Sequence, residues 1–191
     1  MFFRRTAALV LCVIAALFVG VAGANSSDLW HRTVPASACH PLTSAQAVKV
    51  KLQNGGWVFD GANTGTVSFY CPISLNNFWA SGQGNGTFIS SLRIYYRDSN
   101  GTNAAARVTV GLRYRTAAGS FVNVSTLGNP SFNSNSVGGL IDTGHTSIVH
   151  PYLHNVQWDA LYSFVVTLER SNAVEDPAFH GIDFYSGGPA G

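Results

Sequence analysis

Basic and aromatic side chains alternate with apolar ones in two stretches of the sequence, residues 92–97 and 107–115. A period of two indicates strands with one apolar and one polar face, so the basic side chains of each strand share a face. Guanidinium groups beside an aromatic ring are suited to bidentate recognition of sulfate, phosphate or uronate groups. The predicted binding face consists of Arg93, Tyr95, Arg97, Arg107, Arg113 and Arg115. The alternative is a solvated outer face whose arginines pair with acidic residues of neighbouring strands.

Aromatic side chains form a second candidate surface, because sugar rings stack on such side chains in jelly-roll binding modules. The residues concerned are Trp57, Trp79, Tyr152, Trp158 and Tyr185. The alternative is that these side chains pack within a buried sheet.

Three histidines, His145, His150 and His154, follow Asp142 closely enough to suggest a metal site. Neutral imidazole and carboxylate groups are ligands that zinc prefers, but this spacing matches no known motif. We therefore expect a polar loop that leads into the next strand, with no metal and no other cofactor.

Catalytic signatures are weak in this sequence. It contains no G-x-S-x-G motif and no context for a cysteine nucleophile. A carboxylate pair for glycoside hydrolysis would have to come from Asp60, Asp142, Asp159, Glu169, Glu175, Asp176 and Asp183. Because spacing does not show which two face each other, an enzyme is the less favoured interpretation.

The turn at residues 98–103, DSNGTN, carries a candidate modification site. Asn100 begins an N-x-T sequon, and Asp98 two residues earlier meets the stricter bacterial form of that sequon. Asn100 is therefore the candidate glycosylation site.

The first 24 residues are expected to be a secretory signal peptide. Arg4 and Arg5 precede an apolar run, and the small residues Ala22 and Ala24 form an A-x-A cleavage site. The mature chain should begin at Asn25 and be secreted, to the periplasm or the cell exterior. We expect no membrane span after cleavage.

Signal removal changes the charge balance and the cysteine count. Loss of Arg4 and Arg5 lowers the basic residues from 11 to nine, equal to the nine acidic ones. A neutral chain gives no support to nucleic acid as a partner. Cys12 leaves with the signal, and the remaining pair, Cys39 and Cys71, is expected to form a disulfide.

The mature sequence alternates with a period of two almost throughout. Strands are expected at residues 47–52, 66–71, 92–97, 107–115, 121–127, 162–169 and 179–185. Clusters of Gly, Asn and Ser separate them. The expected fold is all-β, an antiparallel β-sandwich of jelly-roll type over residues 46–191. The disulfide should tie an otherwise loose segment, residues 25–45, onto the sheet.

If strands 92–97 and 107–115 pair as neighbours, their register is constrained by burial. The numbers of two opposed residues must add up to an even number, as they do when Tyr96 lies opposite Val108. Only then do the apolar residues of both strands share one face. All five arginines would then lie on the outer face.

Several short motifs resemble a group of uncharacterised secreted bacterial β-domain proteins. These motifs are the early Cys39, a strand that ends in Cys71-Pro-Ile, the late strand YSFVVTLER at 162–170 and the closing strand GIDFY at 181–185. The resemblance implies a disulfide-pinned β-domain and transfers no activity.

These features favour a secreted, non-catalytic β-sandwich protein that binds a glycan or an anionic envelope polymer. The alternatives are a structural surface protein that assembles with copies of itself, and a glycoside-active enzyme.

Overall fold

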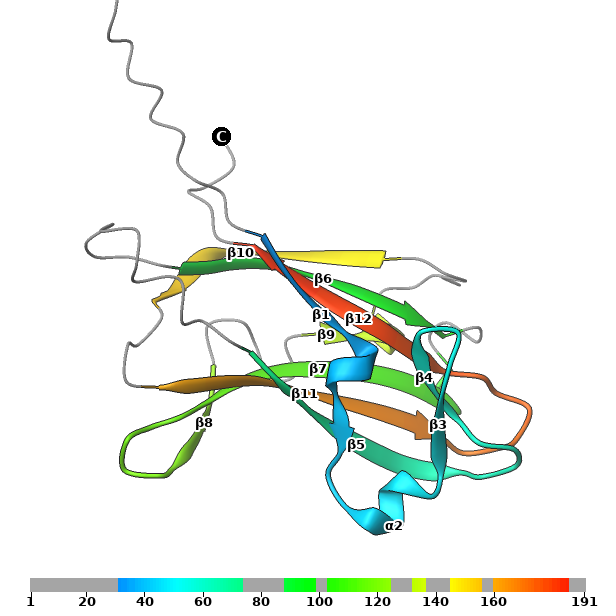
Figure 1. The fold of residues 1–191 in the computed structure, drawn as a ribbon. Coiled ribbons are helices and arrows are strands. Elements are labelled where there is room, and N and C mark those ends of the chain that lie inside the picture. The colour runs from blue at the N-terminus through cyan, green and yellow to red at the C-terminus, as the bar shows by residue number, and fades with distance from the viewer. Residues whose placement is uncertain are drawn as a thin grey trace, which may run out of the picture.

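The computed structural model describes residues 31–73, 88–98, 103–124, 132–136, 145–155 and 160–185. Antiparallel strands form two sheets that pack face to face, one above the other in Figure 1. The fold is therefore an antiparallel β-sandwich with one disulfide, as the sequence predicts.

In the described part of the chain, each of the two sheets has six strands. Sheet A runs in the order β10 (His145–Asn155), β6 (Phe88–Arg97), β12 (Ala178–Tyr185), β4 (Gly56–Phe59) and β3 (Val50–Gln53), and β1 (His31–Pro35) also pairs with β12. Sheet B runs in the order β2 (His40–Pro41), β5 (Gly65–Pro72), β11 (Leu161–Arg170), β7 (Ala106–Arg115) and β8 (Phe121–Asn123), and β9 (Phe132–Asn133) also pairs with β7.

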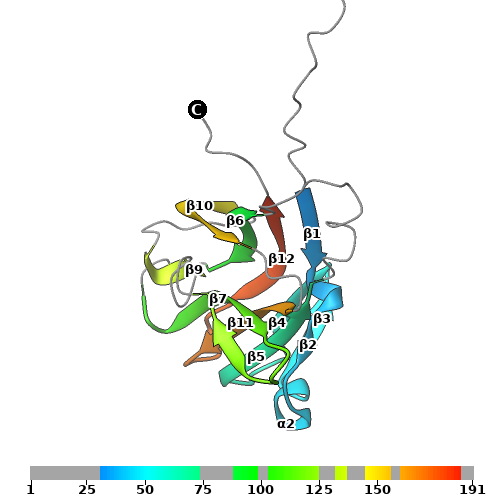
Figure 2. The same ribbon diagram turned by 90° about the vertical axis from the view of Figure 1, so that its left-hand side faces the viewer.

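Among the described residues, helical structure is limited to three short elements, η1 (Ala36–Ala38), α2 (Ser44–Ala47) and η3 (Ser134–Ser136). The α2 helix is capped by Thr43, whose side chain accepts a hydrogen bond from the Gln46 amide at 3.2 Å. It lies next to β2 and β5, on the far side of the molecule from β10 and β6 (Figure 2). In the described part of the chain, no helix has the length and apolar character needed to cross a bilayer.

The core consists of the alternate apolar residues of both sheets. Val67, Phe69 and Cys71 of β5 are fully buried, whereas the residues between them are partly exposed. Aromatic pairs join the two sheets, and one example is Phe164 of β11 with Phe184 of β12, whose ring centroids are 5.6 Å apart. Such pairs add to the apolar burial that holds one sheet on the other.

The disulfide joins Cys39 and Cys71, as predicted, and both residues are fully buried. The segment on either side of Cys39 has more regular structure than the sequence suggests, because β1 before it extends sheet A and β2 after it extends sheet B. The indole N–H of Trp57 also donates to the carbonyl oxygens of Ala36 at 2.8 Å and Cys39 at 3.2 Å. The bridge therefore lies where the chain passes from one sheet to the other.

Two predicted segments differ from the structure. The expected strand at 47–52 is divided, because α2 ends at Ala47 and β3 begins at Val50. The expected polar loop around His145 is wrong, since His145–Asn155 forms β10 against β6. A register shift between Val149 and His154 interrupts this pairing, and the segment includes Pro151, which has no N–H to donate. Pairing with β6, which is distant in the sequence, stabilises this strand. No local pattern in the sequence reveals that pairing.

The strands β6 and β7 do not pair with each other. β6 lies between β10 and β12 in sheet A, whereas β7 lies between β11 and β8 in sheet B. The chain therefore crosses between sheets after β6 instead of forming a hairpin. The condition of the register prediction, that these strands are neighbours, is not met.

Candidate functional site

The predicted arginine face is divided between the two sides of the sandwich. Arg93 and Arg97 lie in β6 of sheet A, whereas Arg107, Arg113 and Arg115 lie in β7 of sheet B. Because the apolar residues of both strands point into the shared core, the alternate positions point outward in opposite directions. The prediction of one continuous basic face is therefore wrong.

The sheet A residues of this set make polar contacts within the protein. The Tyr95 hydroxyl donates to Oδ2 of Asp183 at 2.7 Å, and the Thr33 hydroxyl donates to Oδ1 of Asp183 at the same distance. Arg97 forms an ion pair with Asp176, with Nη2 and Oδ2 2.5 Å apart. These contacts hold the side chains in place and reduce their capacity to bind a polymer.

Two of the sheet B residues, Arg107 and Arg113, line a shallow groove on the outer face of that sheet, with a volume of about 260 Å³. Gly111 of β7 lies opposite Val165 of β11, so the centre of the groove lacks one side chain. The sheet B groove is defined by Arg107, Thr109, Gly111, Arg113, Asn133, Val165 and Thr167.

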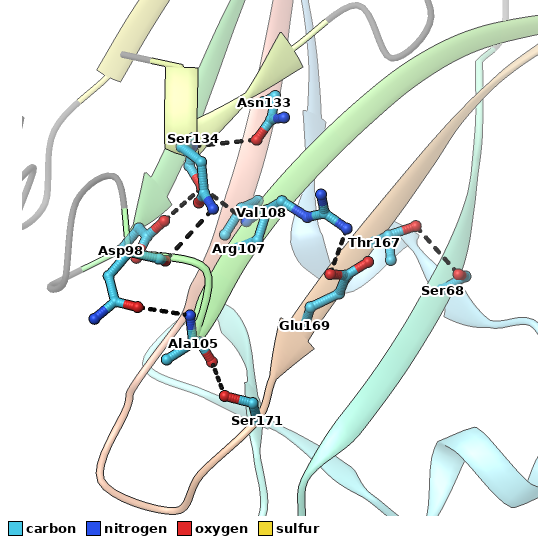
Figure 3. Close-up of polar contacts among 12 residues, drawn as sticks. Ser68, Asp98, Ala105, Arg107, Val108, Asn133, Ser134, Thr167, Glu169 and Ser171 are labelled. Carbon is cyan, nitrogen blue, oxygen red and sulfur yellow. Dashed lines mark hydrogen bonds and ion pairs between the residues drawn. The ribbon is translucent and has the colours of Figure 1, made fainter. Parts of the chain in front are cut away.

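One end of the sheet B groove is fixed by an ion pair. Arg107 Nη2 lies 2.5 Å from Glu169 Oε2, directly across the β7–β11 ladder. The hydroxyls of Thr167 and Ser68 lie 3.1 Å apart and extend the polar row onto β5 (Figure 3). Hydroxyl and guanidinium groups thus form the floor and one wall at this end.

Positive charge is in excess at the other end of the groove. Arg113 Nε donates to Asn123 Oδ1 at 2.9 Å, and Arg115 Nε donates to the Gly119 carbonyl at 3.3 Å. Neither guanidinium pairs with a carboxylate in the described part of the chain. Both acceptors are neutral, so no carboxylate among the described residues balances the charges of Arg113 and Arg115.

An exposed aromatic ring lies beside this charge. Phe121 is 64% exposed, and the guanidinium carbon of Arg115 lies 5.7 Å from the centre of its ring. Leu161, 69% exposed, pairs with Arg115 from the other side. We call Leu161, Arg115 and Phe121 the Phe121 platform. Its three members lie side by side on β11, β7 and β8.

The sequence analysis did not identify Phe121 or Leu161 as site residues. The signal available in the sequence is the period of two in this strand, which puts Phe121 on the face opposite to Val124. Val124 is buried and Phe121 is exposed in the structure.

Other candidates are placed differently or lie outside the description. Trp57 packs against the core, with its ring centroid 5.2 Å from that of Phe69, so it is not a surface platform. Trp79, Trp158 and Asn100 lie outside the described residues. The backbones of Tyr152, Tyr185 and the three histidines of β10 are described, but not their side chains.

Carboxylates are not paired in the grooves of the described structure. The sheet B groove has none in its lining, and a second groove, on sheet A, includes only Asp176. Asp60, Glu169 and Asp176 each pair with a basic side chain instead. Asp142 and Asp159 are outside the described residues. Across the described side chains, no cluster of three metal-binding groups is present.

No protein-family model matches the sequence, and no curated protein matches it. Among solved structures, the chain is similar to a low-affinity xylan-binding module from Roseburia intestinalis, with 13% identity over 85% of this chain and 99% of that one and a TM-score of 0.39. It is also similar to a family 22 carbohydrate-binding module of Clostridium thermocellum, with 12% identity, 89% and 91% coverage and a TM-score of 0.38.

A family two carbohydrate esterase from Cellvibrio japonicus shows a similar likeness, with 10% identity and a TM-score of 0.37. The match covers 83% of this chain but only 34% of the esterase. Similarities at this level transfer no ligand, activity or site residue.

Proposed function

We propose that the chain is an exported, non-catalytic β-sandwich protein that binds a polysaccharide with carboxylate or sulfate groups along the outer face of sheet B. The observation that carries this proposal is the position of Arg113 and Arg115. Within the described structure their guanidinium groups have no carboxylate partner. Arg113 lines the sheet B groove, and Arg115 lies over the exposed Phe121 ring beside it.

The two arginines are suited to an acidic group on the ligand. Each uses Nε for its contact with Asn123 or Gly119, and a guanidinium carries five N–H donors in a planar fork. The terminal nitrogens can therefore form a bidentate contact with a carboxylate or sulfate. A planar, weakly hydrated cation is better suited to this contact than an ammonium group.

The length of the site suits an extended polymer. The outward positions of β7 run from Arg107 to Arg115, which is roughly 27 Å at about 3.4 Å per strand residue. Hydroxyl and amide groups of Thr109, Thr167 and Asn133 line the middle of the groove and can bond to sugar hydroxyls. The Phe121 platform supplies an apolar surface for the face of a sugar ring.

Export is part of the proposal. The Cys39–Cys71 disulfide is consistent with an oxidising compartment, since disulfides are rare in the reducing cytosol. The basic and apolar pattern of residues 1–24 supports a cleaved signal. Mass spectrometry of the exported protein should find Asn25 at its N-terminus.

Affinity electrophoresis of the mature protein tests the binding function. Gels that contain polygalacturonate, alginate or dextran sulfate should retard the wild-type protein, and gels that contain neutral dextran should not. Phe121→Ala should lower the retardation several-fold, because it removes the apolar platform. The matched control is Val174→Ala, which truncates an apolar residue that is 91% exposed and lies in the turn after β11.

Two results would contradict the proposal. If neutral dextran retarded the protein as much as the acidic polysaccharides do, the acidic groups of the ligand would have no role in binding. Retardation by inorganic polyphosphate and by none of the acidic polysaccharides would show that the ligand is not a glycan.

A further inference from the structure

A second groove, of about 250 Å³, lies on the opposite side of the sandwich, on the outer face of sheet A. Its walls come from three separate parts of the chain, namely the β3–β4 hairpin, β6, and the start of β12 with the turn before it. The residues that matter for its chemistry are Lys51, Gln53, Val58, Arg97, Asp176 and His180. This sheet A pocket shares no residue with the sheet B groove.

A β-bulge places His180 in this pocket. Phe179 pairs with Tyr96 and Gly181 pairs with Tyr95, so His180 is an extra residue in β12. Bulges redirect side chains and occur often beside binding sites. The imidazole rests against Gly56 of β4, where an added Cβ would lie only 2.5 Å from Nδ1 of His180. Glycine at this position therefore leaves room for the ring.

The imidazole is neutral at pH 7 and retains its hydrogen-bonding capacity. Burial, with a smaller contribution from the charge of Arg97, lowers the pKa of His180 below its usual value of 6.5. The ring makes no hydrogen bond within the described part of the chain. A neutral imidazole carries one donor and one acceptor. Nδ1 and Cε1 pack against Gly56, so Nε2 is the nitrogen that is available to a ligand.

The charges around the pocket balance each other. Lys51 Nζ lies 2.9 Å from Asp60 Oδ1. Arg97 forms an ion pair with the carboxylate of Asp176 and also donates a hydrogen bond to the backbone carbonyl of Asp176. An anion would have to compete with these carboxylates for the two cations. The hydroxyl groups of an uncharged ligand can instead accept a hydrogen bond from Lys51 or Arg97 and donate one to the carboxylate that pairs with it. Neither ion pair has to break for this.

We propose that the sheet A pocket is a second binding site, for an uncharged, hydroxyl-rich ligand of the size of one sugar unit. Val58 provides an apolar floor, and His180, the Arg97–Asp176 pair and Lys51 provide donors and acceptors around it. The site is independent of the sheet B groove, so either one can be tested while the other is intact.

Titration of the His180 imidazole by NMR, with its signal assigned through a His180→Gln variant, tests this site. The probes are neutral methyl glycosides of glucose, galactose, mannose and xylose, with sodium sulfate as the anionic comparison. At least one glycoside should shift the His180 signal in a saturable manner. A bound neutral sugar should lower the pKa of His180 further, because it displaces water from the ring.

Two variants address the pocket directly. Gly56→Ala should displace the imidazole, and Asp176→Asn should remove a charged acceptor from an exposed position without disturbing the core. Each should weaken the glycoside about fivefold or more, the effect of one lost hydrogen bond. Glu175→Gln is the matched control for Asp176→Asn, because Glu175 does not line the pocket.

The outcomes are distinct. Saturable binding that both Gly56→Ala and Asp176→Asn weaken, while Arg113→Ala leaves it unchanged, would support the site. Binding of sulfate alone, with a raised His180 pKa, would overturn the ligand class. No shift with any glycoside, or a shift that Asp176→Asn leaves unaltered, would overturn the site.

Discussion

The hydroxyl of Ser134 donates a hydrogen bond to the buried carboxylate of Asp98, with 2.5 Å between Oγ and Oδ2 (Figure 3). Asp98 follows β6 of sheet A, and Ser134 follows β9 of sheet B. The same Ser134 oxygen accepts from the Val108 amide of β7 at 2.9 Å. One hydroxyl thus links the two sheets at the point where the chain crosses between them.

We expect Ser134→Ala to lower the free energy of unfolding by about 2 to 3 kcal/mol, because it deprives a buried carboxylate and a buried amide of a partner. Urea denaturation measures this change. Ser171→Ala is the control, since Ser171 donates to the Ala105 carbonyl at 3.1 Å in an exposed position and should cost about 0.5 kcal/mol or less. Equal losses in the two variants would show that the sheet link is not important for stability.

The disulfide should make a large contribution to stability. Cys39 and Cys71 are 32 residues apart, and closure of a loop of this length is worth about 3 to 4 kcal/mol in the chain-entropy model. Denaturation of a Cys39→Ala/Cys71→Ala variant should show a loss of that size. A loss below about 1 kcal/mol would mean that the strand pairing of β1 and β2 alone secures the N-terminal segment.

His180 should make the folding stability depend on pH. Because burial lowers the pKa of His180 in the folded state, the unfolded chain takes up a proton at a higher pH than the folded chain. Stability is therefore lost as the pH falls below about 6.5. The charged groups that line the pocket with His180 are Arg97, Lys51 and Asp176, and Asp60 forms an ion pair with Lys51.

The His180→Gln variant removes this proton uptake. Its free energy of unfolding should fall less than that of the wild-type protein between pH 7 and pH 5.5, as measured by urea denaturation at each pH. A variant whose stability falls as steeply as that of the wild-type protein would contradict the lowered pKa.

Local alternation in the sequence predicts the strands and their buried faces well. The inward residues of β5, β7 and β11 follow the apolar positions of the sequence, because a strand with one buried face has a strict period of two. The even count of cysteines that remains after the expected signal cleavage likewise predicts the disulfide. Both inferences depend only on neighbouring residues or on composition.

Sequence alone does not show which strands become neighbours. The turn after β6 has the composition of a hairpin, yet β6 and β7 belong to different sheets. Their arginines are divided because long-range pairing with β12 and β11 decides the sheet of each strand. The candidate site therefore combines half of the predicted residues with Phe121 and Leu161, whose outward positions depend on register with Arg115.

A charge-matched comparison tests the central claim most directly. The Arg113→Ala/Arg115→Ala variant removes two cations from the sheet B face, and Arg32→Ala/Lys49→Ala removes two cations that line neither the sheet B groove nor the sheet A pocket. Calorimetric titration with polygalacturonate should show that the first variant binds at least about tenfold more weakly than the wild-type protein, the effect of about 1.4 kcal/mol. The second variant should bind within about twofold of the wild-type protein, because exposed charges away from the site contribute little. Equal weakening in both variants, or unchanged affinity in the first, would contradict a polysaccharide site on the outer face of sheet B.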